Sequence, residues 1–110
     1  MFDDEVGRVI ELLAVILEVS EVPVSEIEDW AELRPGFLGR MLKGEKGIPL
    51  RNLFLMLECV MFSPRNFFSL SGLPPEKGIS WRQQVLRELK EIGYESVMMP
   101  PRDIPGGKQR

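Results

Sequence analysis

A tight turn between two short segments constrains this chain more than any other feature. The turn Glu32-Leu33-Arg34-Pro35-Gly36 separates a segment that starts at Pro23 from one that stops at Gly44. Proline is tolerated in the first turn of a helix because an amide hydrogen has no partner there, and glycine commonly follows a helix end. The sequence therefore predicts a short helix over about 23–31, a turn, and a second short helix over 35–43.

Apolar spacing and capping residues predict the other helices. Apolar residues recur at intervals of three and four, which is the spacing of one helix face. Ser63-Pro64 is an N-cap followed by a proline, and Ser80 with Gln83 has the spacing of a capping box. The pattern indicates an all-α chain with a helix-turn-helix unit at its centre. The helices predicted outside this unit cover about 4–19, 50–61, 63–70 and 80–92.

The run Gly72-Leu73-Pro74-Pro75 divides the predicted helices into two groups. We expect residues 1–72 to form a five-helix domain and residues 73–99 to add one amphipathic helix. Residues 100–110 have little to bury and are expected to be a disordered tail. The helix that carries Trp81 suits two roles equally, as a lid on the core or as a seam between two copies.

The composition argues against several classes of protein. The chain has no histidine, the commonest general base and metal ligand, and no nucleophile, base and orienting group occur together. We therefore predict neither an enzyme nor a metal or cofactor site. Cys59, the single cysteine, lies among apolar residues and is expected to be a buried thiol. The apolar runs are too short to span a membrane and the acidic N-terminus is unlike a signal peptide, so we expect a cytoplasmic location.

Charge is distributed unevenly along the chain, whose net charge is −3. Residues 1–33 hold ten acids and one base, whereas residues 34–51 hold five bases and one acid. The basic block coincides with the helix predicted over 35–43 and the loop that follows it. A local basic patch on an acidic domain is a footprint of nucleic-acid binding, although a solvated helix surface has the same composition.

A set of residues spread over 6–70 carries a resemblance to one family. These residues are Ile27, Leu33, Phe37-Leu38, Leu42-Lys43-Gly44, Pro49-Leu50 and Ser63-Pro64 through Phe68. In the order and spacing of these positions the chain resembles the lambda-repressor-like (Cro/cI, XRE-type) helix-turn-helix family, without any insertion. The fold class implied is a five-helix lambda-repressor-like domain followed by one C-terminal helix.

The resemblance implies a DNA-binding transcriptional regulator. The helix over about 34–43 is expected to lie in the major groove of double-stranded DNA, and a homodimer is one expected assembly. In that family the start of this helix faces the bases and the loop after it touches phosphates. Phe37 is equally suited to a thymine methyl and to packing against a neighbour. Carried over to this chain, the DNA-binding set is Arg34, Pro35, Gly36, Phe37, Arg40, Lys43, Lys46 and Arg51.

Two acidic residues depart from the family pattern. Glu28 stands where the family has a small alanine between the two helices of the motif, so we expect its side chain to point outward or the helix crossing to change. Glu32 stands where glycine is common in the turn. An alternative function follows from the acidic face Glu26, Glu28 and Asp29. In this alternative, the fold is a protein-interaction or antitoxin-like module that binds a basic partner and binds DNA weakly or not at all.

Overall fold

A long N-terminal helix forms the centre of the molecule, and shorter helices surround it. The computed structural model describes residues 2–97, with side chains from residue 5 onward, and the tail predicted over 100–110 lies outside the described residues. Within this range the regular secondary structure is entirely helical, which confirms the all-α prediction. The helices are α1 (Phe2–Ser20), α2 (Val24–Trp30), α3 (Phe37–Leu42), α4 (Leu50–Cys59), α5 (Pro64–Ser71) and α6 (Trp81–Glu91).

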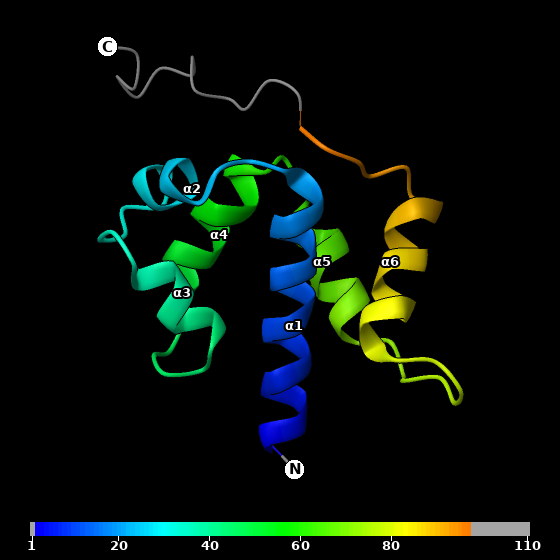
Figure 1. Cartoon of the computed structure of the whole chain (residues 1–110). Coiled ribbons are helices and arrows are strands. Elements are labelled where there is room, and N and C mark those ends of the chain that lie inside the picture. The colour runs from blue at the N-terminus through cyan, green and yellow to red at the C-terminus, as the bar shows by residue number, and fades with distance from the viewer. Residues whose placement is uncertain (1, 98–110) are drawn as a thin grey trace.

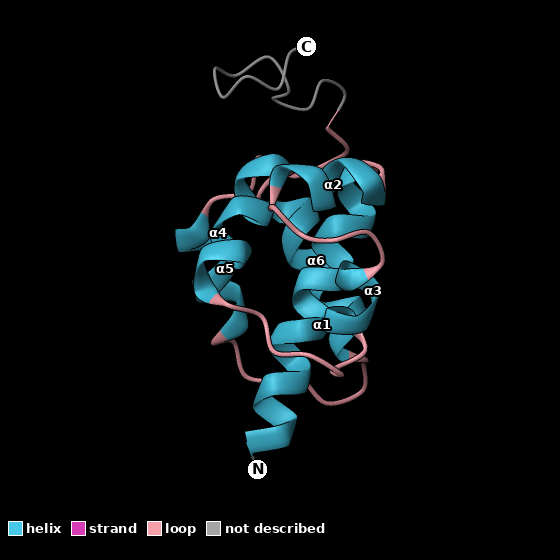
Figure 2. Cartoon of the chain, turned by 90° about the vertical axis from the view of Figure 1, so that its left-hand side faces the viewer, coloured by secondary structure: helices cyan, strands magenta, loops and turns pink. Residues whose placement is uncertain are grey.

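Helix α1 is covered from several sides. Figure 1 shows α1 in the middle, with α2, α3 and α4 on one side and α5 and α6 on the other. Helix α1 contacts α3, α5 and α6, and in Figure 2 α2 lies across the top of the molecule, where it contacts α3 and α4. Because neighbours surround its second half, α1 buries Leu12, Leu13, Val15 and Ile16 there. Its first half extends past them, and Val6 is 55% exposed.

The core draws side chains from every helix, and burial of their apolar surface is the main force that stabilises the fold. The predicted buried thiol, Cys59, is 2% exposed and belongs to this core. The buried apolar residues are Leu12, Leu13, Val15, Ile16, Leu17, Val22, Ile27, Ala31, Leu38, Met41, Leu53, Met56, Leu57, Cys59, Val60, Phe62, Phe67, Leu70, Val85 and Leu89.

Helices α4 and α5 also carry large apolar side chains that face solvent. Phe54 and Phe68 are both exposed and meet edge to face, with their ring centroids 6.2 Å apart. Leu50 at the start of α4 and Met61 in the loop between the two helices are exposed as well. None of the described helices alone is long and apolar enough to cross a membrane, and only α4 and α5 taken together, with a bend of 113°, pass a test of length and composition.

The predicted capping residues set the ends of α3, α5 and α6. The hydroxyl of Ser63 accepts a hydrogen bond from the Asn66 N–H at 3.3 Å. Ser80 and Gln83 form both bonds of the capping box at the start of α6. Gly44, which follows the C-cap Lys43 of α3, has a φ of 80°, a left-handed conformation that stops the helix at little cost for glycine. These predictions from local sequence are confirmed.

Helix α6 is a lid on α1. The indole N–H of Trp81 donates to the carbonyl of Arg8 at 3.0 Å, and the Arg8 guanidinium lies 4.5 Å from the centroid of the Trp81 ring. The buried amide of Gln84 donates to the carbonyl of Pro74 at 2.9 Å and accepts from the Glu76 N–H at 3.1 Å, which holds the preceding loop against the helix. Of the two roles expected for this helix, the structure thus shows Trp81 in a lid that covers α1.

The segment after α6 crosses back to the ends of α1 and α4. The Tyr94 hydroxyl donates to the carbonyl of Val60 at 2.7 Å, and its ring meets Phe62 edge to face at 4.9 Å. The Val97 N–H donates to the carbonyl of Ser20 at 2.9 Å. Burial raises the pKa of Tyr94 to about 12.

Candidate nucleic-acid interface

A β-turn precedes α3, and α3 begins two residues later than predicted. The Phe37 N–H donates to the carbonyl of Arg34 at 3.0 Å, and Gly36 has a φ of 85° and a ψ of −12°. These angles, with proline before the glycine, are those of a type II turn. A positive φ at Gly36 is incompatible with a right-handed helix, so Pro35 and Gly36 lie in the turn and the helix predicted over 35–43 shortens to Phe37–Leu42.

Glu28 caps the start of α3. Its side chain is 6% exposed, and its Oε2 accepts hydrogen bonds from the Gly36 N–H at 2.9 Å and from the Leu38 N–H at 3.2 Å. The first N–H groups of a helix have no partner within the helix, and a carboxylate there also meets the positive end of the helix dipole. The expectation that Glu28 points outward is therefore wrong, because the backbone of α3 supplies the hydrogen bonds that water would have supplied.

This capping role removes Glu28 from the predicted partner face. Asp29 remains exposed on α2 and Glu26 is half-buried. The sequence does hold a signal for this burial of Glu28, because Glu28 precedes the apolar Ala31 by three residues. This spacing places Glu28 on the inner side of the helix with the buried Ala31.

Glu32 joins the end of α2 to the start of α4. It has a φ of 63°, a left-handed conformation that usually favours glycine, and the Leu33 N–H closes the helix end on the carbonyl of Glu28 at 2.8 Å. Both carboxylate oxygens of Glu32 accept from Arg51, at 2.8 and 3.4 Å. The Asn52 side chain donates to the carbonyl of Ala31 at 2.8 Å beside this pair. Arg51 therefore already has an acidic partner in the free protein.

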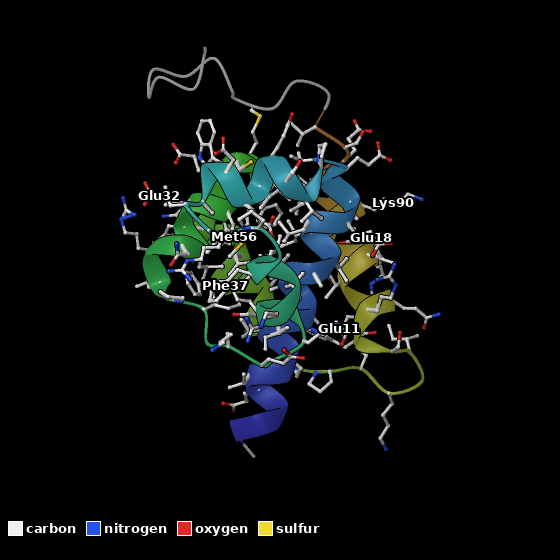
Figure 3. The ribbon with its side chains drawn as sticks, turned by 60° about the vertical axis from the view of Figure 1, so that its left-hand side comes forward. Glu11, Glu18, Glu32, Phe37, Met56 and Lys90 are labelled. Atoms are coloured by element: carbon white, nitrogen blue, oxygen red, sulfur yellow. The ribbon has the colours of Figure 1, made fainter. Side chains whose placement is uncertain are left out.

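The predicted DNA-binding residues lie on α3, in the segments on either side of it and, for Arg51, at the start of α4. Phe37 is half-buried and packs against the core, so packing is the role of Phe37 that the structure shows. On α3 itself Leu38 and Met41 are buried, while Gly39 and Arg40 face solvent. Figure 3 shows Phe37 and Glu32 on one side of the molecule, away from Lys90, which lies across α1. The other exposed members of the set are Arg34, Pro35, Gly36, Lys43, Lys46 and Arg51.

The cations of this set differ in their partners. Nε of Arg40 lies 3.7 Å from Oε1 of Glu45, so Arg40, like Arg51, has a carboxylate beside it. Among the described residues, Arg34, Lys43 and Lys46 have no carboxylate within ion-pair distance. We call the five cations Arg34, Arg40, Lys43, Lys46 and Arg51 the α3 surface.

A groove separates the first half of α1 from the loop that follows α3. Its volume is about 540 Å³, and Val6, Val9 and Ile10 line it on the α1 side. Ile48 and the backbone around Gly47 line the other side, with Lys46 among the lining residues. One end of the α3 surface therefore borders the groove. Within the described part of the chain, no group of three His, Cys, Asp or Glu side chains is arranged to hold a metal ion.

Comparisons with protein-family models, with curated protein sequences and with solved structures find no match to this chain.

Proposed function

We propose that the chain is a DNA-binding transcriptional regulator of the lambda-repressor-like helix-turn-helix class. In this proposal α2 and α3 are the motif, α3 enters the major groove, and the α3 surface contacts the duplex. The observation that carries the proposal is the position of three exposed cations, Arg34 before α3 and Lys43 and Lys46 after it, which have no carboxylate within ion-pair distance among the described residues.

The dimensions of α3 suit this role. A helix of six residues is roughly 9 Å long, and the major groove, about 12 Å wide, admits an α-helix. Gly39 and Arg40 form its exposed side, and the capped start of α3 is held against α2 by Glu28. The helix can therefore enter a groove as a rigid unit, with cations at both ends positioned for phosphates on either strand.

The same geometry supports limited base reading. Arg40 is the only long polar side chain on the exposed side of α3 in the described structure, because Phe37 packs inward and Gly39 has no side chain. Arg34 projects from the turn before the helix and adds a second candidate for a bidentate contact with guanine. Most of the affinity is then expected from phosphate contacts, which carry little sequence information.

A charge-reversal experiment tests the proposal. The variant Arg40→Glu/Lys43→Glu should lose binding to duplex DNA, whereas the control Lys77→Glu/Lys90→Glu makes the same change in net charge at exposed sites in and before α6. Circular dichroism should show the same helical content for both variants. Equal affinity of the two variants for DNA would contradict a role of α3.

A second candidate function is a protein-interaction module, and the exposed aromatic pair Phe54–Phe68 favours it. Aromatic side chains are enriched at the centres of protein interfaces, and this pair is already ordered by its own edge-to-face contact. Asp29 is exposed on α2 and is the residue of the acidic face that a basic partner would contact. Replacement of both aromatic residues by serine should abolish association, including a homodimer, if this surface is used. An unchanged mass in solution and unchanged partner binding would contradict it.

A further inference from the structure

Two of the five cations of the α3 surface have a neighbouring carboxylate within ion-pair distance. Arg51 makes a two-bond pair with Glu32, and Arg40 lies beside Glu45. All four side chains are more than half exposed, between 54% and 66%. A phosphate that approaches either arginine therefore meets a carboxylate beside the guanidinium.

We propose that Glu32 and Glu45 compete with phosphate for Arg51 and Arg40, and so lower the affinity of the α3 surface for any duplex that does not engage both arginines. This inference rests on the proposed function and specifies how affinity is regulated at the same site. DNA binding is then an exchange, in which each arginine breaks its ion pair with a carboxylate and forms a new one with a phosphate oxygen.

Both the ion pair and the carboxylate that it frees affect the binding of phosphate. An exposed ion pair contributes little to stability, so it can open without unfolding the protein. Once the arginine has turned to the phosphate, the carboxylate stays close to the same phosphate and repels it. The net release of counterions is also smaller, because the freed carboxylate recruits a cation from solution while the phosphate releases one.

The backbone around Glu32 keeps its carboxylate at this site. Glu32 has a φ of 63° in the turn, and the Leu33 N–H bond to Glu28 and the Asn52 bond to Ala31 fix this turn against α4. The residue therefore remains beside Arg51 whether or not DNA is bound. Glutamine has the same backbone preferences and nearly the same volume as glutamate, so Glu32→Gln removes the charge and little else.

The test compares Glu32→Gln, Glu45→Gln and the double variant with a matched control, Glu91→Gln. The control removes one exposed carboxylate on α6, across α1 from α3. Each protein is titrated against one mixed-sequence duplex over a range of salt concentrations. We expect each α3-surface variant to bind about threefold to tenfold more tightly than the control. Its plot of log K against log salt should be steeper by up to about 0.9 for each arginine released.

A double-mutant cycle separates the pair from a general charge effect. In an Arg51→Gln background, Glu32→Gln should increase affinity by less than it does in the wild type, because the arginine that it frees is absent. If the wild type binds duplex but Glu32→Gln and Glu45→Gln bind no more tightly than Glu91→Gln, the competition is disproved while the proposed function stands. If no protein in the series binds duplex at low salt, the proposed function itself is disproved.

Discussion

The carboxylate of Glu28 on α2 accepts the N–H of Gly36 at 2.9 Å, eight residues further along the chain. With the second bond, to the Leu38 N–H, this contact links the two short helices on either side of the turn through a buried charged group. Glu28, which the charge pattern of the sequence assigned to an acidic surface, thus caps the start of α3.

Loss of this cap should destabilise the protein. We expect Glu28→Ala to lower the free energy of unfolding by about 1–3 kcal/mol, because two backbone N–H groups lose their acceptor in a part-buried site. Glu28→Gln keeps a carbonyl acceptor and should have a smaller effect. Urea denaturation measures both changes. The control is Glu58→Ala at an exposed site on α4, and a loss at residue 28 no larger than in this control would contradict the capping role.

Removal of a strained side chain should stabilise the protein. Met61 follows α4 with a φ of 57° and is 62% exposed, so its Cβ is unfavourable while its side chain buries little. Met61→Gly should raise the free energy of unfolding by up to about 1 kcal/mol, whereas Met61→Ala keeps the Cβ and should leave it nearly unchanged. Equal thermal stability of the two variants would show that the left-handed conformation carries no cost here.

Tyr94 should make stability fall at alkaline pH. Burial raises its pKa in the folded protein to about 12 from the ordinary value of 10.0, so the folded state holds the phenolic proton more tightly than the unfolded state does. This contribution is complete below pH 10 and is lost as the pH rises towards 12. Tyr94→Phe should remove this pH dependence, and it should also cost about 1 kcal/mol at neutral pH through the lost hydrogen bond to Val60.

The titration of Tyr94 can be followed directly, because it is the only tyrosine of the chain. Phenolate absorbance should show the folded protein ionising near pH 12 and the unfolded protein near pH 10, with circular dichroism reporting the folded fraction. Ionisation near pH 10 while the helices remain intact would contradict the burial of the hydroxyl.

Local signals in the sequence predicted most of the helix ends. Ser63, Ser80 and Gly44 act through backbone groups within a few residues, so their effect can be read from the sequence alone. The start of α3 could not be predicted in this way. A proline such as Pro35 suits both the first turn of a helix and the second position of a β-turn, and Gly36 permits either outcome.

The candidate site was predicted less completely than the fold. Sequence charge identified the basic block, but the partner of each cation depends on tertiary geometry. Arg51 meets Glu32 only because the start of α4 packs against the end of α2, where Asn52 binds the carbonyl of Ala31. For the same reason, apolar spacing did not show that Phe54 and Phe68 remain exposed, since no described element covers that part of α4 and α5.

DNA binding by the α3 surface is tested most simply by titrating the purified full chain against mixed-sequence duplex DNA at low and at physiological salt. The mass of the protein in solution is measured alongside. The three cations without an ion-pair partner in the described part of the chain predict that log K falls linearly with log salt with a slope of about −3 or steeper. A complex of this kind would establish that the α3 surface outweighs the acidic first third of the chain. An absence of binding at low salt would contradict DNA binding and leave the aromatic pair Phe54–Phe68 as the better guide to function.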